Sequence, residues 1–198
     1  MDEFTPIEVV GPFNHPPPGI IVRRERISVE DVVQLGELLV TNVARTASDL
    51  ARHLPRAVAV THLDALPAAA GLSAADVAPL IARHRGARGV RQCQATLSLM
   101  DGGAQSPKES WLRLVLIDAG LPRPRTQIEV RGHDGCRLAY LDMGWDGPMV
   151  AVEYDGDQHR SDRRQYVKDI RRFQRVEELG WRLVRVAMKI DLAISSSA

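Results

Sequence analysis

The feature that most constrains the fold is a short apolar run that contains two acidic residues. The run is Met149-Val150-Ala151-Val152-Glu153-Tyr154-Asp155-Gly156, and its β-branched and aromatic residues predict a strand. Side chains alternate along a strand, so Glu153 and Asp155 are expected to share one face. Carboxylates are poor strand residues and are costly to bury, so a cation or dense hydrogen bonding must compensate them here.

A third carboxylate, Asp142, lies eleven positions before Glu153, across a turn. It shares a strand face with Leu138 and Tyr140, so we expect it to interrupt an apolar row that faces inward. The alternative is an aspartate at a hairpin end that reaches water. Because divalent metals compensate converging carboxylates, Asp142, Glu153 and Asp155 together predict a site for Mg²⁺ or Mn²⁺.

Positive charge is concentrated directly after this strand, although the net charge of the chain is only +1. Between Arg160 and Arg185, nine basic residues stand against four acidic ones. Guanidinium groups suit bidentate contact with phosphates, so the segment predicts a phosphate-binding surface; a solvated helix face is the alternative. The candidate phosphate contacts are Arg163, Arg164, Lys168, Arg171 and Arg175.

Length and composition predict a globular protein of one or two domains, with 198 residues of which 44% are hydrophobic. No run approaches the roughly 18 to 20 apolar residues that span a bilayer, and no cationic start precedes an apolar run. We therefore expect a cytoplasmic location and no membrane partner. Cys93 and Cys136 lack paired or metal-type spacing, which predicts reduced structural thiols.

Residues 1–104 are predicted to form a mainly helical region that ends in a linker. Ser28 with Asp31, and Ser73 with Asp76, have the spacing of helix caps and predict helix starts. Short strands are expected at 7–10, 19–22 and 37–41, and helices at 44–54 and 56–70. Pro67 is expected to kink or end the second of these helices.

Residues 105–190 are predicted to follow the order helix, three strands, helix, strand, and residues 191–198 to form a tail. The first helix begins at Ser106, with Pro107 in its first position. Glu109 has the capping-box position, so it is either this cap or a further metal ligand. The strands are expected at 126–130, 136–143, 149–155 and 181–187, and Gly180 ends the helix before the last strand.

This order of elements, with acidic residues in the first helix and in the second and third strands, resembles the PD-(D/E)xK nuclease superfamily. Four stretches are similar to one branch, an uncharacterised bacterial family related to very-short-patch mismatch-repair endonucleases: 140–145, 152–159, Asp169 with Arg172, and 179–186. The resemblance covers about residues 106–186. It implies an α/β protein with a restriction-endonuclease-like αβββαβ core that acts as a metal-dependent DNA endonuclease, in repair or defence.

The resemblance also implies roles for individual residues. Asp142, Glu153, Asp155 and Glu109 match the acidic positions, and His159 lies where the mismatch-repair endonucleases use an imidazole as general base. Asp155 stands where the superfamily usually places lysine, so the cation expected to stabilise the attacked phosphate is absent from that position. The alternative function is therefore a catalytically inactive DNA-binding or antitoxin-like regulator on a nuclease scaffold.

The stretch from Val40 to Arg52 is similar to the middle region of longer actinobacterial-type members, which begin with a winged helix resembling abortive-infection antitoxins. We expect this chain to begin inside that middle region, without the winged helix. Arg45, Thr46, Asp49 and Arg52 are expected to hold the two regions together, with direct DNA contact as the alternative. DNA is the expected partner, and a homodimer or a further protein partner remains open.

Overall fold

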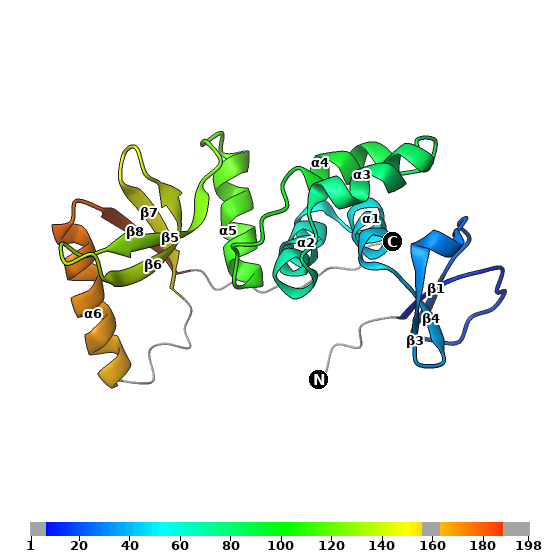
Figure 1. The fold of residues 1–198 in the computed structure, drawn as a ribbon, viewed down its shortest axis with the longest axis horizontal. Coiled ribbons are helices and arrows are strands. Elements are labelled where there is room, and N and C mark those ends of the chain that lie inside the picture. Colours follow the sequence, from blue (N-terminus) through cyan, green and yellow to red (C-terminus); the bar gives the residue numbers. More distant parts are fainter. Residues whose placement is uncertain (1–6, 156–162, 188–198) are drawn as a thin grey trace.

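The computed structural model describes residues 7–155 and 163–187, with side chains from residue 171 onward in the second stretch. In these residues it contains six α-helices and three small sheets, which confirms the mixed α/β class. In Figure 1 the elements formed by residues 7–97 lie at one end of the molecule, and the sheet formed by residues 125–186 lies at the other. Helix α5 (Pro107–Asp118) lies between the two ends.

Two small sheets begin the described chain. Strand β1 (Ile7–Val10) pairs in parallel with β2 (Ile20–Arg23), and β3 (Val32–Leu35) forms a hairpin with β4 (Leu38–Thr41). The predicted helix start at Ser28 is confirmed, but the helix is a single 3-10 turn. Ser28 and Asp31 do form a capping box, but only on the single turn η1 (Val29–Asp31), and β3 follows directly. The β-branched pair that opens β3 favours a strand over a longer helix.

Four helices complete this first region: α1 (Val43–His53), α2 (Arg56–Ala70), α3 (Ala74–Arg83) and α4 (Val90–Leu97). Their apolar faces form one core, made of Ala47, Ala51, Leu63, Leu72, Val77, Cys93 and Leu97. Pro67 does not end α2, which continues to Ala70 and stops at Gly71 in the left-handed conformation. Within the described residues, no single helix is long and apolar enough to span a membrane.

The second region has the element order expected from the sequence. After α5 come β5 (Arg125–Arg131), β6 (Arg137–Trp145), β7 (Val150–Tyr154), α6 (Arg163–Glu178) and β8 (Arg182–Val186). The sheet order is β5-β6-β7-β8, with β8 parallel to β7 and the other neighbours antiparallel. A parallel neighbour requires a crossover, and α6 supplies it.

Helices cover both faces of this sheet, with α5 on one side and α6 on the other (Figure 1). Leu112 of α5 packs against Met143 and Val152. Val176 of α6 belongs to a separate cluster with Ile128, Val130, Ala139, Leu141, Ala151 and Trp181. Burial on both faces explains why β7 is apolar at consecutive positions instead of alternating.

The inward row of β6 differs from the expected one. Ala139 and Leu141 are buried on the α6 side of the sheet and Met143 on the α5 side, whereas Tyr140 is 41% exposed. Ile128 of β5 is the register partner of Leu141 and is itself buried. Asp142 therefore does not interrupt an apolar row that it shares with Tyr140.

A buried ion pair joins the two regions. Arg113 of α5 donates to Asp64 of α2 at 2.7 Å, and both side chains are 0% exposed. Asp64 also accepts a hydrogen bond from the backbone N–H of Asp101, at 2.8 Å. Fully buried charges are tolerated only when they are paired, so this contact fixes α5 against α2.

A matched pair of variants tests this joint. We expect Asp64→Ala to lower the free energy of unfolding by about 3 to 5 kcal/mol, because it leaves a buried guanidinium without its partner. Asp118→Ala is the control: it removes the Arg56–Asp118 pair between the same two helices, whose side chains are 42% and 54% exposed. Its expected cost is below about 1 kcal/mol. If urea denaturation showed an equally small loss of unfolding free energy in both variants, the buried Arg113–Asp64 joint would be contradicted.

Candidate functional site

The carboxylates Asp142 and Glu153 meet where strands β6 and β7 separate. The strands pair at Trp145–Val150, Gly144–Ala151 and Met143–Val152, and Asp142 and Glu153 occupy the next position. There the backbone ladder is replaced by side chains. The Asp142 N–H donates to Glu153 Oε1 at 3.0 Å, and the Tyr154 N–H donates to Asp142 Oδ2 at 2.8 Å. We call this position the strand fork.

The backbone is also irregular on the other side of Asp142. Gln127 of β5 falls opposite Asp142, between the register pairs Thr126–Met143 and Ile128–Leu141, and has a φ of +49°. Positive φ is uncommon for a residue other than glycine and tends to occur at functional positions. The sheet therefore departs from regular pairing on both sides of Asp142.

Glu153 is the most strongly perturbed acid of the fork. Its side chain is nearly buried, and this burial, with the charge of Asp142, raises the pKa of Glu153 to about 7. The Asp142 N–H, Arg172 and Arg185 act in the opposite direction but do not cancel the effect. Arg172 approaches Glu153 Oε2 to 3.8 Å, which is beyond hydrogen-bond distance. At neutral pH the fork thus holds a carboxylate on the border of ionisation, as is common at functional sites.

Glu109 caps helix α5, which confirms the first of the two roles predicted for it, helix cap or metal ligand. Its N–H donates to Ser106 Oγ at 3.2 Å, and its carboxylate accepts from Ser106 Oγ and from the Gln105 N–H, both at 2.9 Å. The same carboxylate lies near enough to Asp142 for the two charges to act on each other. Burial raises the pKa of Glu109, and the charge of Asp142 raises it further. Capping therefore places Glu109 beside Asp142 instead of excluding it from the acidic group.

Asp155 follows the end of β7. Its backbone N–H donates to the carbonyl of Val186 at 3.0 Å, so pairing with β8 continues past the fork. The ammonium group of Lys108, next to Glu109 on α5, lies 5.2 Å from the centre of the Tyr154 ring. A lysine is thus positioned near the end of β7, but it belongs to helix α5 and not to the strand.

The candidate phosphate contacts are only partly described. Arg171 and Arg175 are exposed on α6. Arg175 borders a pocket of about 450 Å³ beside the β5–β6 turn, which also contains His133 and Arg137. His159, and the side chains of Arg163, Arg164 and Lys168, lie outside the described residues.

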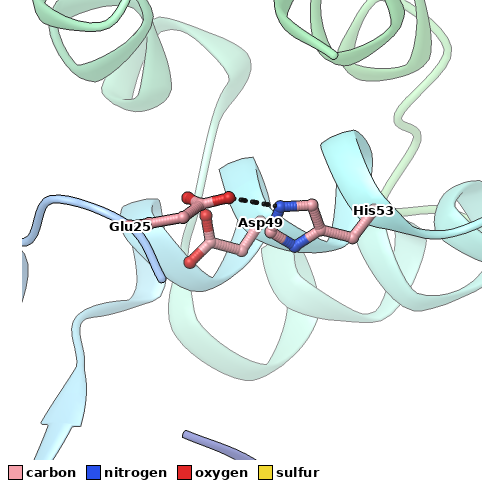
Figure 2. Close-up of side chains that lie close together, drawn as sticks. All are labelled: Glu25, Asp49 and His53. Carbon is pink, nitrogen blue, oxygen red and sulfur yellow. Dashed lines mark hydrogen bonds and ion pairs between the residues drawn. The ribbon is translucent and has the colours of Figure 1, made fainter. Parts of the chain in front are cut away.

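A second acidic group lies in the first region and was not anticipated as a metal site. Glu25 follows β2, and Asp49 and His53 lie one turn apart on α1; Figure 2 shows the three side chains together. One ligand atom from each lies within 4.8 Å of the others, so this group could hold a metal ion. His53 Nε2 and Glu25 Oε1 are 2.8 Å apart. The spacing of Asp49 and His53, four apart on a helix, was the available sequence signal.

Arginines already neutralise this second group. Arg52 donates to both oxygens of Glu25, at 2.7 and 3.0 Å, and Arg45 Nε donates to Asp49 at 2.8 Å. Burial tends to raise the pKa of Glu25, but Arg52 and His53 outweigh it and the pKa is lowered. A metal here would have to displace hydrogen-bonded guanidinium groups, whereas at the fork the Arg172–Glu153 ion pair, at 3.8 Å, is longer than a hydrogen bond.

The same contacts correct the expected role of the α1 polar face. Arg45 bonds to Glu25, Asp31 and Asp49, all within the first region, and its side chain is 2% exposed. It is therefore unavailable for direct DNA contact. Between the two regions, the buried joint is made by Arg113 and Asp64.

Comparison with known proteins gives relatives without an assigned function. The chain is similar to two uncharacterized proteins of Mycobacterium tuberculosis, from strains CDC 1551 / Oshkosh and ATCC 25618 / H37Rv. Each is 33% identical over 150 residues, which is 76% of this chain and 55% of the relative. The chain thus spans about half the length of the curated relatives it matches. No family model matches the sequence, and no solved structure matches it.

The perturbed carboxyl of Glu153 makes stability depend on pH. Its pKa is about 7 in the folded protein against an ordinary 4.5, so the folded state holds this proton more tightly than the unfolded chain does. In EDTA, the free energy of unfolding should therefore fall as pH rises from 5 to 8, by up to about 3 kcal/mol from this group.

Glu153→Gln should remove that loss and be more stable than the parent at pH 8, because glutamine can still accept the Asp142 N–H. Glu178→Gln, on the exposed end of α6, is the control and should follow the parent. The measurement is urea unfolding at pH 5 and pH 8. A parallel pH dependence in parent and Glu153→Gln would contradict the buried environment of Glu153.

Proposed function

We propose that this protein is a metal-dependent DNA endonuclease whose reaction centre is the strand fork. The observation that carries the proposal is the meeting of Asp142 and Glu153 at the point where β6 and β7 separate, with Glu109 within electrostatic reach of Asp142. The element order α5-β5-β6-β7-α6-β8 supports it, since it is the order that the resemblance to restriction-endonuclease-like proteins predicts.

The fork supplies donors of the kind that a hard divalent cation prefers, although in the described residues the group whose ligand atoms lie within 4.8 Å of one another is Glu25, Asp49 and His53. Asp142, Glu153 and Glu109 supply carboxylate oxygens, the ligands that Mg²⁺ and Mn²⁺ prefer. A bound cation would relieve the repulsion among these groups and would acidify a water for attack on a phosphodiester. The chain itself contributes a buried acid that gives up its proton near neutral pH, and backbone hydrogen bonds that fix both fork carboxylates.

The exposed arginines of α6 are proposed to bind DNA phosphates on either side of the reacting one. Such contacts position a strand but carry no information about its sequence. Arg171 and Arg175 are solvent-exposed and therefore available for this role. His159 remains the proposed general base, as implied by its likeness to the mismatch-repair endonucleases.

A catalytically inactive DNA-binding or antitoxin-like regulator is the second candidate. One feature favours it: Asp155 occupies the position where the superfamily has its lysine. In that case the fork would be a retained structural feature, and DNA binding would persist without cleavage.

Stabilisation by metal ions distinguishes two candidate metal sites, the strand fork and the group of Glu25, Asp49 and His53 in Figure 2. We expect 10 mM Mg²⁺ or 1 mM Mn²⁺ to raise the melting temperature by roughly 5 °C if it exceeds the Kd about 100-fold, since only the folded state brings the ligands together. Glu153→Gln should abolish the rise. His53→Gln, in the group formed by Glu25, Asp49 and His53, should retain it.

The reverse pattern, with the rise lost in His53→Gln and kept in Glu153→Gln, would move the metal site to the first region. Plasmid nicking under the same conditions then tests the reaction itself. Metal and DNA binding without nicking would favour the inactive regulator.

The role of α6 is tested by salt dependence. Each phosphate contact that is lost should flatten the slope of log affinity against log salt by about 0.9. Arg171→Gln with Arg175→Gln should therefore reduce the slope by roughly 2 if both reach phosphates. Arg85→Gln with Arg91→Gln is the control, because it removes the same charge from exposed positions in the first region. Equal slopes in the two double variants would make α6 an ordinary solvated face.

A further inference from the structure

Two arginines flank the buried carboxylate of the fork on the α6 side. Arg185 is the register partner of Glu153 in the parallel pair β7–β8, so the two side chains leave the sheet on the same face. Arg172 reaches the same carboxylate from α6, at 3.8 Å from Glu153 Oε2. Both guanidinium charges act on Glu153 and lower its pKa against the larger effect of burial.

Phe173 holds these two guanidinium groups together. Their central carbons lie 3.8 Å (Arg185) and 4.6 Å (Arg172) from the centre of its ring. Stacking on an aromatic ring fixes a guanidinium by its face and leaves the N–H groups at its edge free to bind in the plane. Two such groups beside one ring present a preorganised set of donors.

These donors are poorly used by the protein. Arg172 Nε is buried and has no hydrogen-bond partner among the described residues. The contact of Arg172 with Glu153, at 3.8 Å, is too long for a hydrogen bond. Guanidinium edges suit a phosphate, which accepts two parallel hydrogen bonds from one arginine.

We propose that Arg172 and Arg185 form a phosphate-binding pair that engages DNA when a divalent cation takes over the charge of Glu153. The proposal rests on the metal site of the proposed function, because the cation is what releases the arginines from their shared carboxylate. The pair would supply the positive charge that the superfamily takes from lysine at the position of Asp155. The phosphate and the cation would then lie on neighbouring groups of one site.

The proposed change of partner of the two arginines, from Glu153 to a DNA phosphate, is tested by fluorescence anisotropy with a short fluorescein-labelled DNA duplex. Binding is measured in EDTA and in Ca²⁺, and Ca²⁺ is used to allow binding without turnover. The parent should bind more tightly in Ca²⁺. Arg172→Gln with Arg185→Gln should lose this gain and bind roughly tenfold or more weakly than the parent in Ca²⁺. Arg182→Gln, an exposed arginine at the other end of β8, is the control and should keep the gain.

A thermal scan with Ca²⁺ alone separates the two proposals. If Ca²⁺ stabilises the double variant as it does the parent while the DNA gain is lost, the phosphate-binding pair is supported. Undiminished DNA binding by the double variant in Ca²⁺ would overturn it and leave the metal site standing. Loss of the Ca²⁺ stabilisation in the double variant would make the arginines mere supports of the carboxylates. No stabilisation of the parent would overturn the metal site, and the exchange with it.

Discussion

The arrangement of the molecule depends on how helix α5 is held. One side of α5 is fixed to α2 by the fully buried Arg113–Asp64 pair, and the other packs Leu112 onto the sheet. Removing either charge would leave the other buried without a partner, so the pair tolerates little change. The position of Glu109 beside the fork is a consequence, because its own helix cap directs its carboxylate from the start of α5.

The fork is a place where local electrostatics oppose stability. The Glu153 carboxylate accepts the Asp142 N–H and the Asp142 carboxylate accepts the Tyr154 N–H, where a regular sheet would use main-chain carbonyls. Burial and the charge of Asp142 raise the pKa of Glu153. Structural carboxylates are normally compensated by cations of the protein, as Glu25 is by Arg52. Among the described residues, Arg172 comes within 3.8 Å of Glu153, which is too long for a hydrogen bond, and the pKa of Glu153 is raised where that of Glu25 is lowered.

Much of the second region could be predicted from the sequence. Helix caps and stops at Ser106 and Gly180, and the apolar run of β7, are local signals that tertiary packing reinforces. The secondary structure of the first region was harder to predict. A capping box at Ser28 and Asp31 predicts a helix start, but those two residues alone do not determine how many turns follow. The buried positions of β6 were also misassigned, because helices cover both faces of this sheet and packing against α5 and α6 decides which side chains are buried.

By itself, the sequence determined the order of elements from α5 to β8 and placed Asp142 and Glu153 on two successive strands. These features follow from the periodicity of apolar residues and from helix caps, which depend on residues close together in the chain. Only the tertiary structure decided that β6 and β7 separate at these carboxylates, that Glu109 lies within electrostatic reach of Asp142 while capping α5, and that Asp49 and His53 gain Glu25 as a neighbour. These outcomes depend on contacts between residues far apart in the chain, and on the burial that those contacts create. Burial sets the pKa of Glu153, and it cannot be read from local sequence.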